Sequence, residues 1–257
     1  MLWEIADTPH RMLGSMHVLP AAVSMPKWFA ASHDGIERFV FECDYNQRQT
    51  KIFGRDVTRA HLKRYGAPDL YRRAKQLLIK NGVGGPLEDF KPWKAAYIIG
   101  QKLAPTYGFF GESGVEMTLR ALVEGKKLVV EFFEANTRSS ELTDEACKPF
   151  QDGLALLRKC LKEAESGAIK REYERQSRAW LTCDLADFAA IQREQFADFP
   201  FISGVHLQRN REWVAVAKKL FAETTPTLLV MGAFHTVGTR SFIELMEGEG
   251  FKFKFVS

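Results

Sequence analysis

The sequence predicts an α/β fold with a central mixed or mostly parallel β-sheet, flanked by helices and extended by helical cap insertions. Short apolar and β-branched runs alternate along the chain with longer helical stretches, which is typical of sheets whose strands are joined by helices. The 257 residues are 46% hydrophobic and 26% charged, enough apolar sequence for a substantial core. No Gly/Ser-rich linker interrupts the sequence, so we predict one domain over residues 1–257.

Short apolar runs predict the strands of this sheet. Each run is too short for a helix with an apolar face, and turn-forming residues or polar stretches separate the runs. The predicted strands are 2–5, 11–16, 38–43 (RFVFEC), 127–133 (KLVVEFF), 226–231 (PTLLVM) and 251–256 (FKFKFV).

Longer stretches between these runs predict helices. They span 26–34, the basic 55–80, 93–103, 115–124, 141–198, 205–222 and 239–248. Gly125 closes the fourth of these stretches, and Ser113 followed by Glu116 at its start is typical of a capping box. The helical elaborations at about 55–110 and 141–198 are expected to form the cap.

Composition limits the classes of function. No stretch reaches the roughly 18 to 20 apolar residues that a membrane-spanning helix needs, and the segment MLWEIADTPHR lacks the basic and apolar parts of an export signal. We therefore expect no membrane span, and a cytoplasmic location if Met1 is the native start or a periplasmic or secreted one if an export signal was removed. The cysteines show no C-x-x-C spacing. Free structural thiols are expected at Cys43, Cys147, Cys160 and Cys183.

Basic charge is concentrated between residues 51 and 80. This segment holds nine Lys or Arg and two Asp, an excess of seven, whereas the whole chain has a net charge of +4. A pair of solvated helices broken at 66–68 accounts for the excess, and an anion-binding surface is the alternative. The small total charge does not favour nucleic acid as a partner; if nucleic acid did bind, its retention would depend strongly on salt.

Two copies of one motif carry the main functional signal. An apolar run followed by Gly-x-x-His occurs in RMLGSMH, with Gly14 and His17, and again in LVMGAFH, with Gly232 and His235. In open α/β sheets ligands bind beyond the carboxyl ends of the strands, and a glycine there lets the backbone turn sharply or approach another group closely. We predict that both imidazoles lie in one cleft. The alternative is two separate loop histidines bonded to main-chain oxygens.

Carboxylates follow two further predicted strands. The segment RFVFECD places Glu42 and Asp44 on one face of its strand and Cys43 on the other, because side chains alternate along a strand. Glu134 directly follows the strand at 127–133. Glu42 has apolar neighbours, and an unpaired carboxylate withdrawn from water would be costly. Two imidazoles with two or three carboxylates suit a divalent metal or a general acid/base pair.

An arginine on an apolar helix stripe adds a cation to this set. In VHLQRNREWVAVAKKLFAE, Arg209 lies four residues before Trp213 on the stripe that is expected to face the core. A guanidinium keeps its proton, so its burial requires a carboxylate, a phosphate or an oxyanion within reach. The alternative is an arginine at the rim of the stripe with its charge in solvent.

Together these residues resemble a known family. The segments LWEI, LGSMHVLP, FVFECD, GVEMTLRA, VVEFFEA, LQRNREW and LLVMGAFHTVGTRSFIELMEGEGFKFKFV are similar, in order, to the TraB/GumN/TIKI family, whose pattern is a pair of G-x-x-H motifs with a glutamate and an arginine between them. The resemblance covers almost the whole chain and is weakest at 141–198. Two departures affect the pocket: Glu116 stands where the pattern commonly has Asp, and Met16 and Phe234 are bulkier than usual.

The resemblance implies an α/β core shared with erythromycin-esterase-like and ChaN-like proteins. TIKI members are described as metal-dependent proteases that use divalent ions such as manganese or cobalt. TraB-type members are tied to shutting down peptide pheromones, and GumN has no assigned reaction. By matching position, the motif histidines are His17 and His235, the strand-end glutamate is Glu42, the motif arginine is Arg209, and Glu134 fits the glutamate after the middle strand.

The sequence therefore predicts a metal-dependent hydrolase of the peptidase type. The predicted metal ligands are His17, Glu42 and His235. The metal would be Mn, Co or Zn, with Fe also permitted, and would lower the pKa of a bound water. Glu134 or Asp44 would orient that water, and Arg209 would stabilise the oxyanion. A peptide or other small acyl or amide substrate is expected ahead of an ester or lactone, and a site without metal stays open.

The competing prediction is a binding protein. The same cleft would then capture a metal, a haem, a peptide or a saccharide, or serve in signalling, without turnover. Metal analysis followed by a cleavage assay with His235→Ala as the inactive variant separates the two classes. The sequence carries no signal for the oligomeric state.

Overall fold

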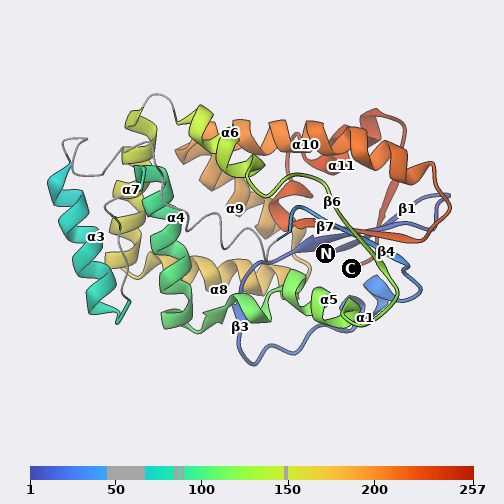
Figure 1. Cartoon of the computed structure of the whole chain (residues 1–257), viewed down its shortest axis with the longest axis horizontal. Helices are drawn as coiled ribbons and strands as arrows, with labels where there is room; N and C mark the ends of the chain where they lie inside the picture. Colours follow the sequence, from blue (N-terminus) through green and yellow to red (C-terminus); the bar gives the residue numbers. More distant parts are fainter. Residues whose placement is uncertain (45–66, 84–86, 88–89, 148–149) are drawn as a thin grey trace.

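The computed structural model describes residues 1–44, 67–83, 87, 90–147 and 150–257. Within these residues the fold is α/β, as predicted from the sequence: a mixed sheet lies between two groups of helices, and further helices extend from one end of it (Figure 1). The main core packs around this sheet, and a second cluster of buried apolar residues lies among the helices of the extension.

The main sheet of the described chain has six strands in the order β6-β4-β7-β2-β1-β8. Parallel pairing joins β6 to β4, β4 to β7 and β7 to β2, whereas β1 pairs antiparallel with β2 and β8. Each predicted strand is present; β1 has the predicted ends, and the ends of the other strands differ from the prediction by one or two residues. The strands are β1 (Leu2–Ile5), β2 (Arg11–Ser15), β4 (Arg38–Phe41), β6 (Val129–Phe132), β7 (Thr227–Gly232) and β8 (Phe253–Phe255).

The register of the parallel strands aligns their carboxyl ends. Ser15 at the end of β2 pairs with Gly232 at the end of β7. Main-chain bonding between β4 and β6 continues past both strands, since Glu134 N donates to the carbonyl oxygen of Glu42 at 3.0 Å. The residues that follow β2, β4, β6 and β7 therefore leave the sheet at the same edge.

Helices cover both faces of the sheet. Figure 1 shows α10 (Pro200–Phe221) and α11 (Phe242–Gly248) on one side, and α1 (Lys27–His33) and α5 (Val115–Val123) on the other. Helix α10 begins five residues earlier than predicted, with a proline in its first turn, where proline is tolerated. Helix α11 begins three residues later, because the Ser241 hydroxyl caps it by accepting from Glu244 N.

The remaining helices form the cap at one end of the sheet. Helices α3 (Pro68–Lys80), α4 (Pro92–Leu103) and α7 (Phe150–Glu165) pack around the second apolar cluster, and α6 (Arg138–Ala146), α8 (Ala168–Leu181) and α9 (Leu185–Asp198) join it to the sheet. The predicted helical region at 141–198 is thus divided. Its breaks include Gly167 and Cys183, whose positive φ values of 72° and 56° do not continue a helix. The part of the predicted basic helix at 55–66 lies outside the described residues.

A small second sheet was not predicted. It pairs β3 (Leu19–Pro20) with β5 (Phe109–Phe110) in antiparallel fashion, next to the short turns η2 (Ala104–Tyr107) and η3 (Gly111–Ser113). Two-residue strands have no periodic signal in a sequence, so this pairing could not be expected.

The cysteines are free, as predicted, with Cys43 and Cys147 buried and Cys160 and Cys183 partly exposed. Among the described residues, no helix combines the length and the apolar character that crossing a membrane requires.

Candidate functional site

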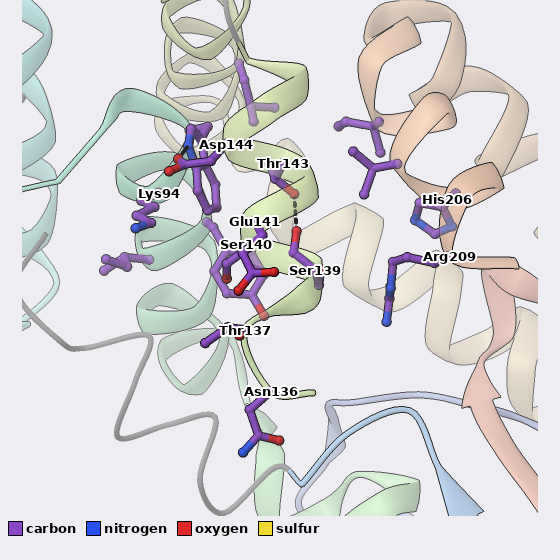
Figure 2. A pocket seen from close by; sticks show the side chains of 16 residues that line it. Lys94, Asn136, Thr137, Ser139, Ser140, Glu141, Thr143, Asp144, His206 and Arg209 are labelled. Carbon is purple, nitrogen blue, oxygen red and sulfur yellow. Dashed lines mark hydrogen bonds between the residues drawn. The ribbon is translucent and has the colours of Figure 1, made fainter. Parts of the chain in front are cut away.

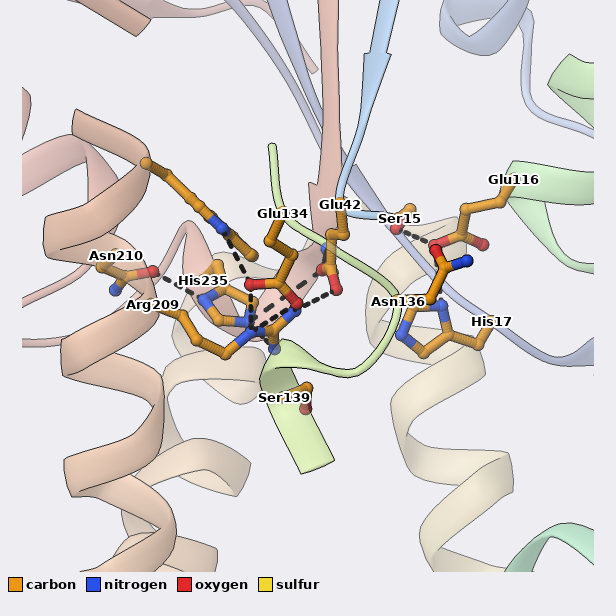
Figure 3. Close-up of polar contacts among 12 residues, drawn as sticks. Ser15, His17, Glu42, Glu116, Glu134, Asn136, Ser139, Arg209, Asn210 and His235 are labelled. Carbon is orange, nitrogen blue, oxygen red and sulfur yellow. Dashed lines mark hydrogen bonds and ion pairs between the residues drawn. The ribbon is translucent and has the colours of Figure 1, made fainter. Parts of the chain in front are cut away.

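Four strand ends bring predicted side chains to one edge of the sheet (Figure 3). His17 follows β2, Glu42 follows β4, Glu134 follows β6, and His235 lies in η4 (Ala233–His235) after β7. A Cβ placed on Gly232 would lie 3.1 Å from Glu42 Oε1 and 3.8 Å from His17 Nε2. The same point lies 3.7 Å from Cδ2 of His235. The two motif histidines therefore face one small volume beside a carboxylate.

The motif glycines allow this close assembly. A Cβ on Gly14 would lie 3.1 Å from Thr236 Oγ1 and 3.3 Å from the Cα of Ala233, so a side chain there would push β2 away from the turn after β7. The amide of Gly232 donates to Glu42 Oε1 at 2.5 Å, and a side chain at this position would enter the volume between the histidines. Both glycines are thus explained by close approach.

Arg209 lies at the centre of the polar cluster and is 6% exposed. Its Nη2 donates to Glu42 Oε2 at 2.6 Å and to Glu134 Oε1 at 2.9 Å, and its Nε lies 3.1 Å and 3.2 Å from the two oxygens of Glu134. Its Nη1 lies 3.1 Å from His235 Nε2, and the guanidinium is 4.6 Å from the Trp213 ring centroid. The buried arginine therefore has the carboxylate partners that its burial requires.

Burial and pairing shift the pKa values of Glu42 and Glu134 in opposite directions. Burial alone would raise the pKa of Glu42, but the charge of Arg209, the nearby imidazoles and the Gly232 amide outweigh it and hold that pKa well below its ordinary value. Burial prevails for Glu134, and its pKa lies above the ordinary value despite its bonds to Arg209. Glu42 is therefore the more strongly ionised of the two carboxylates.

His235 is neutral and held in one tautomer. Burial, followed by the neighbouring His206 and Arg209, lowers its pKa well below the ordinary value. Its Nδ1 lies 2.6 Å from Asn210 Oδ1, which is assigned as the acceptor because the amide nitrogen of Asn210 donates to the carbonyl oxygen of Arg240. His235 Nδ1 therefore donates, and its Nε2 accepts from Arg209. Both ring nitrogens are in use.

His17 forms a second polar group with Glu116. Its Nδ1 lies 2.7 Å from Glu116 Oε1, which also accepts a hydrogen bond from the Ser15 hydroxyl. The carboxylate is buried, with 4% of its side chain exposed, whereas the imidazole is 48% exposed. In the neutral ring with Nδ1–H donating to the carboxylate, Nε2 would carry the lone pair. This nitrogen lies toward the volume beside Gly232.

This contact corrects the capping-box prediction for Ser113 and Glu116. Helix α5 begins at Val115 with Gly114 as its N-cap and has no side-chain cap. A Cβ on Gly114 would lie 2.3 Å from the carbonyl oxygen of His17, so the helix start lies directly against the motif loop. Glu116 is directed at His17 by this packing. A local pattern could not reveal it, because the partners are about a hundred positions apart along the chain.

Asp44 lies outside the polar cluster. Its carboxylate pairs with Arg120 at 3.1 Å, and its amide donates to Asn136 Oδ1 at 2.9 Å. The prediction that it shares a face with Glu42 assumed a strand through residue 43, but β4 ends at Phe41 and the chain bends there. The two-residue alternation of side chains therefore no longer holds at Asp44.

The predicted metal ligands lie close together, but the atoms of Glu42 and His235 that would bind a metal already accept hydrogen bonds. The Glu42 oxygens accept from Arg209 and from the Gly232 amide, and the lone pair of His235 Nε2 faces Arg209. Among the described residues, no group of three or more His, Cys, Asp or Glu side chains could hold a metal ion. The fixed positive charge of the guanidinium also opposes a second cation beside it. A divalent metal does not fit the donors as they are arranged, and metal binding stays a prediction.

Several contributors to the site were not predicted from the sequence. Ser15 lies inside the first motif and Asn210 lies next to Arg209, so their position beside motif residues was the available signal. His206 had no such signal. Its ring stacks on His235 with centroids 4.3 Å apart, one helical turn before Arg209.

The fold and the site together define an α/β protein with a His/Glu/Arg cluster at the carboxyl edge of its parallel strands. Comparison with protein families narrows this class. The profile of the TraB/PrgY/gumN family matches residues 1–254, and the chain belongs to this family. Comparisons with curated proteins and with solved structures find no match.

Proposed function

We propose that this protein is a hydrolase that cleaves an acyl bond, a peptide or other amide first and an ester or lactone second, with His17 as its general base. The observation that supports the proposal is the pair of His17 and Glu116. A partly exposed imidazole is oriented by a buried carboxylate at 2.7 Å and turns its other nitrogen toward the volume beside Gly232. This is the arrangement by which histidine removes a proton from a nucleophile in many hydrolases.

The proton transfers use side chains that are already in place. A water within reach of His17 Nε2 gives up a proton to that nitrogen while its oxygen attacks the substrate carbonyl carbon. Glu116 and the ionised Glu42 stabilise the imidazolium that forms. His17 then returns the proton to the leaving nitrogen or oxygen as the acyl bond breaks. Ser15 keeps Glu116 oriented by donating to the same oxygen that His17 contacts.

Arg209 has one donor left for the oxyanion. A guanidinium has five N–H groups, and its contacts with Glu42, Glu134 and His235 use the Nε–H, both Nη2–H groups and one Nη1–H. The second N–H of Nη1 is the group that would stabilise negative charge on the substrate oxygen. In this proposal Glu134 and His235 are positioning residues, because they fix the guanidinium.

The proton transfers described above do not use a divalent metal, but the test of the proposal includes one. Bound at this edge of the sheet, a metal would supply an activated water. The atoms of Glu42 and His235 that would bind a metal already accept hydrogen bonds from Arg209. The proposed proton transfers therefore use the side chains alone.

The test is a panel of peptide, anilide, ester and lactone substrates, assayed with EDTA and with added manganese, cobalt or zinc. We expect His17→Ala to lower kcat/KM by about 10²- to 10⁴-fold, the usual contribution of a general base, with Glu116→Gln also reduced. His33→Ala removes a histidine outside the site and should keep wild-type turnover. Equal activity of the His17→Ala and wild-type proteins would refute the proposal. Activity that appears only with added metal would support the metal-dependent form.

One observation favours a second candidate, a binding protein without turnover. Arg209 and His235 have most of their hydrogen-bonding groups in use within the fold, which is typical of structural networks as well as of prepared sites. A ligand held tightly by the wild-type protein, and released unchanged, would support this alternative.

A further inference from the structure

A cavity of about 390 Å³ adjoins the polar cluster on the side of the cap. Figure 2 shows it between α4, α6 and α10, with Arg209 and His206 on one wall and Asn136 near its lower end. Its size lies within the range of pockets that hold small molecules. Arg209 belongs both to this wall and to the cluster at the strand ends, so the cavity adjoins the proposed site.

Most of the wall area of the cavity is apolar, while α6 and the residues just before it add hydroxyl and amide groups. Aromatic rings come from α4, and branched aliphatic side chains come from α4, α7 and α10. The apolar lining consists of Trp93, Tyr97, Ile98, Leu156, Ile202 and Val205.

The charged side chains that line the cavity already interact with other side chains at its edge. Asp144 accepts from Lys91 Nζ at 2.5 Å and from Trp93 Nε1 at 2.8 Å, and Glu141 lies 3.9 Å from an Arg138 nitrogen. Lys94 Nζ lies over the Trp93 ring, 5.3 Å from its centroid. A charged substrate group entering the cavity would lose water and would compete with these existing contacts, whereas an apolar group would gain by leaving water.

His206 is a partly exposed histidine that the proposed proton transfers do not use. Its ring lines the cavity and stacks on His235. Burial, and then the charge of Arg209, lowers its pKa to about 3, so the ring is neutral at physiological pH. Its Nδ1 has almost no accessible surface, so His206 contributes to the cavity wall as an uncharged ring and not as a hydrogen-bonding group.

We propose that this cavity is the specificity pocket of the enzyme. It receives a large, uncharged, apolar side chain, such as that of Phe or Leu, next to the acyl bond that is cut. The inference rests on the proposed hydrolase function, because it names the substrate class of that site.

The first experiment compares N-acetyl-X-anilides in which X is Phe, Leu, Ala, Lys or Glu. We expect kcat/KM for Phe and Leu to exceed that for Ala by about 10- to 100-fold, the gain from burying such a side chain. Ile202→Trp, which fills the cavity, should reduce the preference of Phe and Leu over Ala to less than threefold. Ile79→Trp adds the same side chain on an exposed face of α3 and should leave the preference unchanged. A preference for Lys or Glu would overturn the proposal.

A binding measurement separates failure of the pocket from failure of the proposed reaction. N-acetyl-phenylalaninamide and N-acetyl-alaninamide are titrated into the inactive His17→Ala protein and followed by NMR. Stronger binding of the phenylalanine probe, lost in His17→Ala/Ile202→Trp, supports the pocket even where no anilide is cleaved. Equal binding of the two probes refutes the pocket whether or not hydrolysis is found.

Discussion

At the scale of single residues, the site depends on the charge balance around Arg209. Its position on an apolar stripe predicted burial and an anionic partner, and the structure gives it two carboxylates, Glu42 and Glu134. The identity of the partner could not be predicted, because a carboxylate, a phosphate and an oxyanion all satisfy a buried guanidinium. Glu42 and Glu134 reach it from different strands, an arrangement set by the register of the sheet.

Removing this guanidinium should destabilise the fold strongly. We expect Arg209→Met to lower the free energy of unfolding by about 3–5 kcal/mol, because two buried carboxylates lose their counter-charge. Urea denaturation measures the change. Arg138→Met, which breaks a half-exposed pair with Glu212, is the control and should cost less than about 1 kcal/mol.

A triple variant shows whether the cost comes from unpaired charge. Arg209→Met combined with Glu42→Gln and Glu134→Gln leaves no buried charge in the cluster and should recover a large part of the lost stability. A single variant as stable as the wild type, or a triple variant less stable than the single one, would contradict this account.

At the scale of elements, the start of α5 determines the position of Glu116. The sequence predicted the helix itself, and it predicted the strands of the main sheet from their apolar runs. It assigned Glu116 to a cap, because Ser113-x-x-Glu116 is a local pattern and the competing contact with His17 is not local. The division of the predicted helical region at 141–198 was also not predicted. One break lies at Cys183, whose left-handed conformation is uncommon for a residue other than glycine and cannot be predicted from its residue type.

Gly114→Ala should separate α5 from the loop that carries His17. The added methyl would lie 2.3 Å from the main-chain oxygen of His17 and 2.9 Å from that of Gly111, so the backbone would have to shift. We expect a loss of about 1–3 kcal/mol in the free energy of unfolding and a fall in any activity that needs the pair of His17 and Glu116. Gly111→Ala lies in the neighbouring turn with no atom near its added methyl, and should change stability by less than about 0.5 kcal/mol. Similar unfolding curves for both variants would show that the close approach is not required.

At the scale of the whole molecule, the buried neutral histidines make stability depend on pH. His206 has an ordinary pKa of 6.5 when unfolded and about 3 when folded, and the pKa of His235 is also lowered by burial. Between these values the unfolded chain binds more protons than the folded one, so the free energy of unfolding falls as pH falls below about 6.5. Glu134, whose pKa is raised, acts in the opposite direction: its stabilising effect is present at low pH and is lost as pH rises through its folded value.

Urea unfolding at pH 7.5, 6 and 5 tests this balance. The His206 term alone should remove up to about 2 kcal/mol between pH 6.5 and 5. His206→Asn cannot take up a proton and should show a smaller fall over the same interval. Stability that is constant from pH 7.5 to 5, or equal slopes for the two proteins, would contradict the neutral buried state of His206.

The fold class and the assembly of two distant motifs were predictable at this scale, because they follow from element order and from the rule that ligands bind at the carboxyl edge of parallel strands. The cavity was not predictable. Its lining comes from the cap and from α10, where apolar periodicity indicates which helix faces are buried but not which faces leave space between them.

The order of strands has a consequence for synthesis on the ribosome. β7, at residues 227–232, lies between β2 and β4 in the sheet, so the two earlier strands have no shared partner until more than two hundred residues have emerged. Until then β2 and β4 present apolar, unpaired edges, the kind of surface on which nascent chains aggregate and chaperones act. When β7 inserts, it completes the sheet and brings the second motif histidine to the site at the same time. A polypeptide that stalls before this point therefore has neither a completed core nor a site.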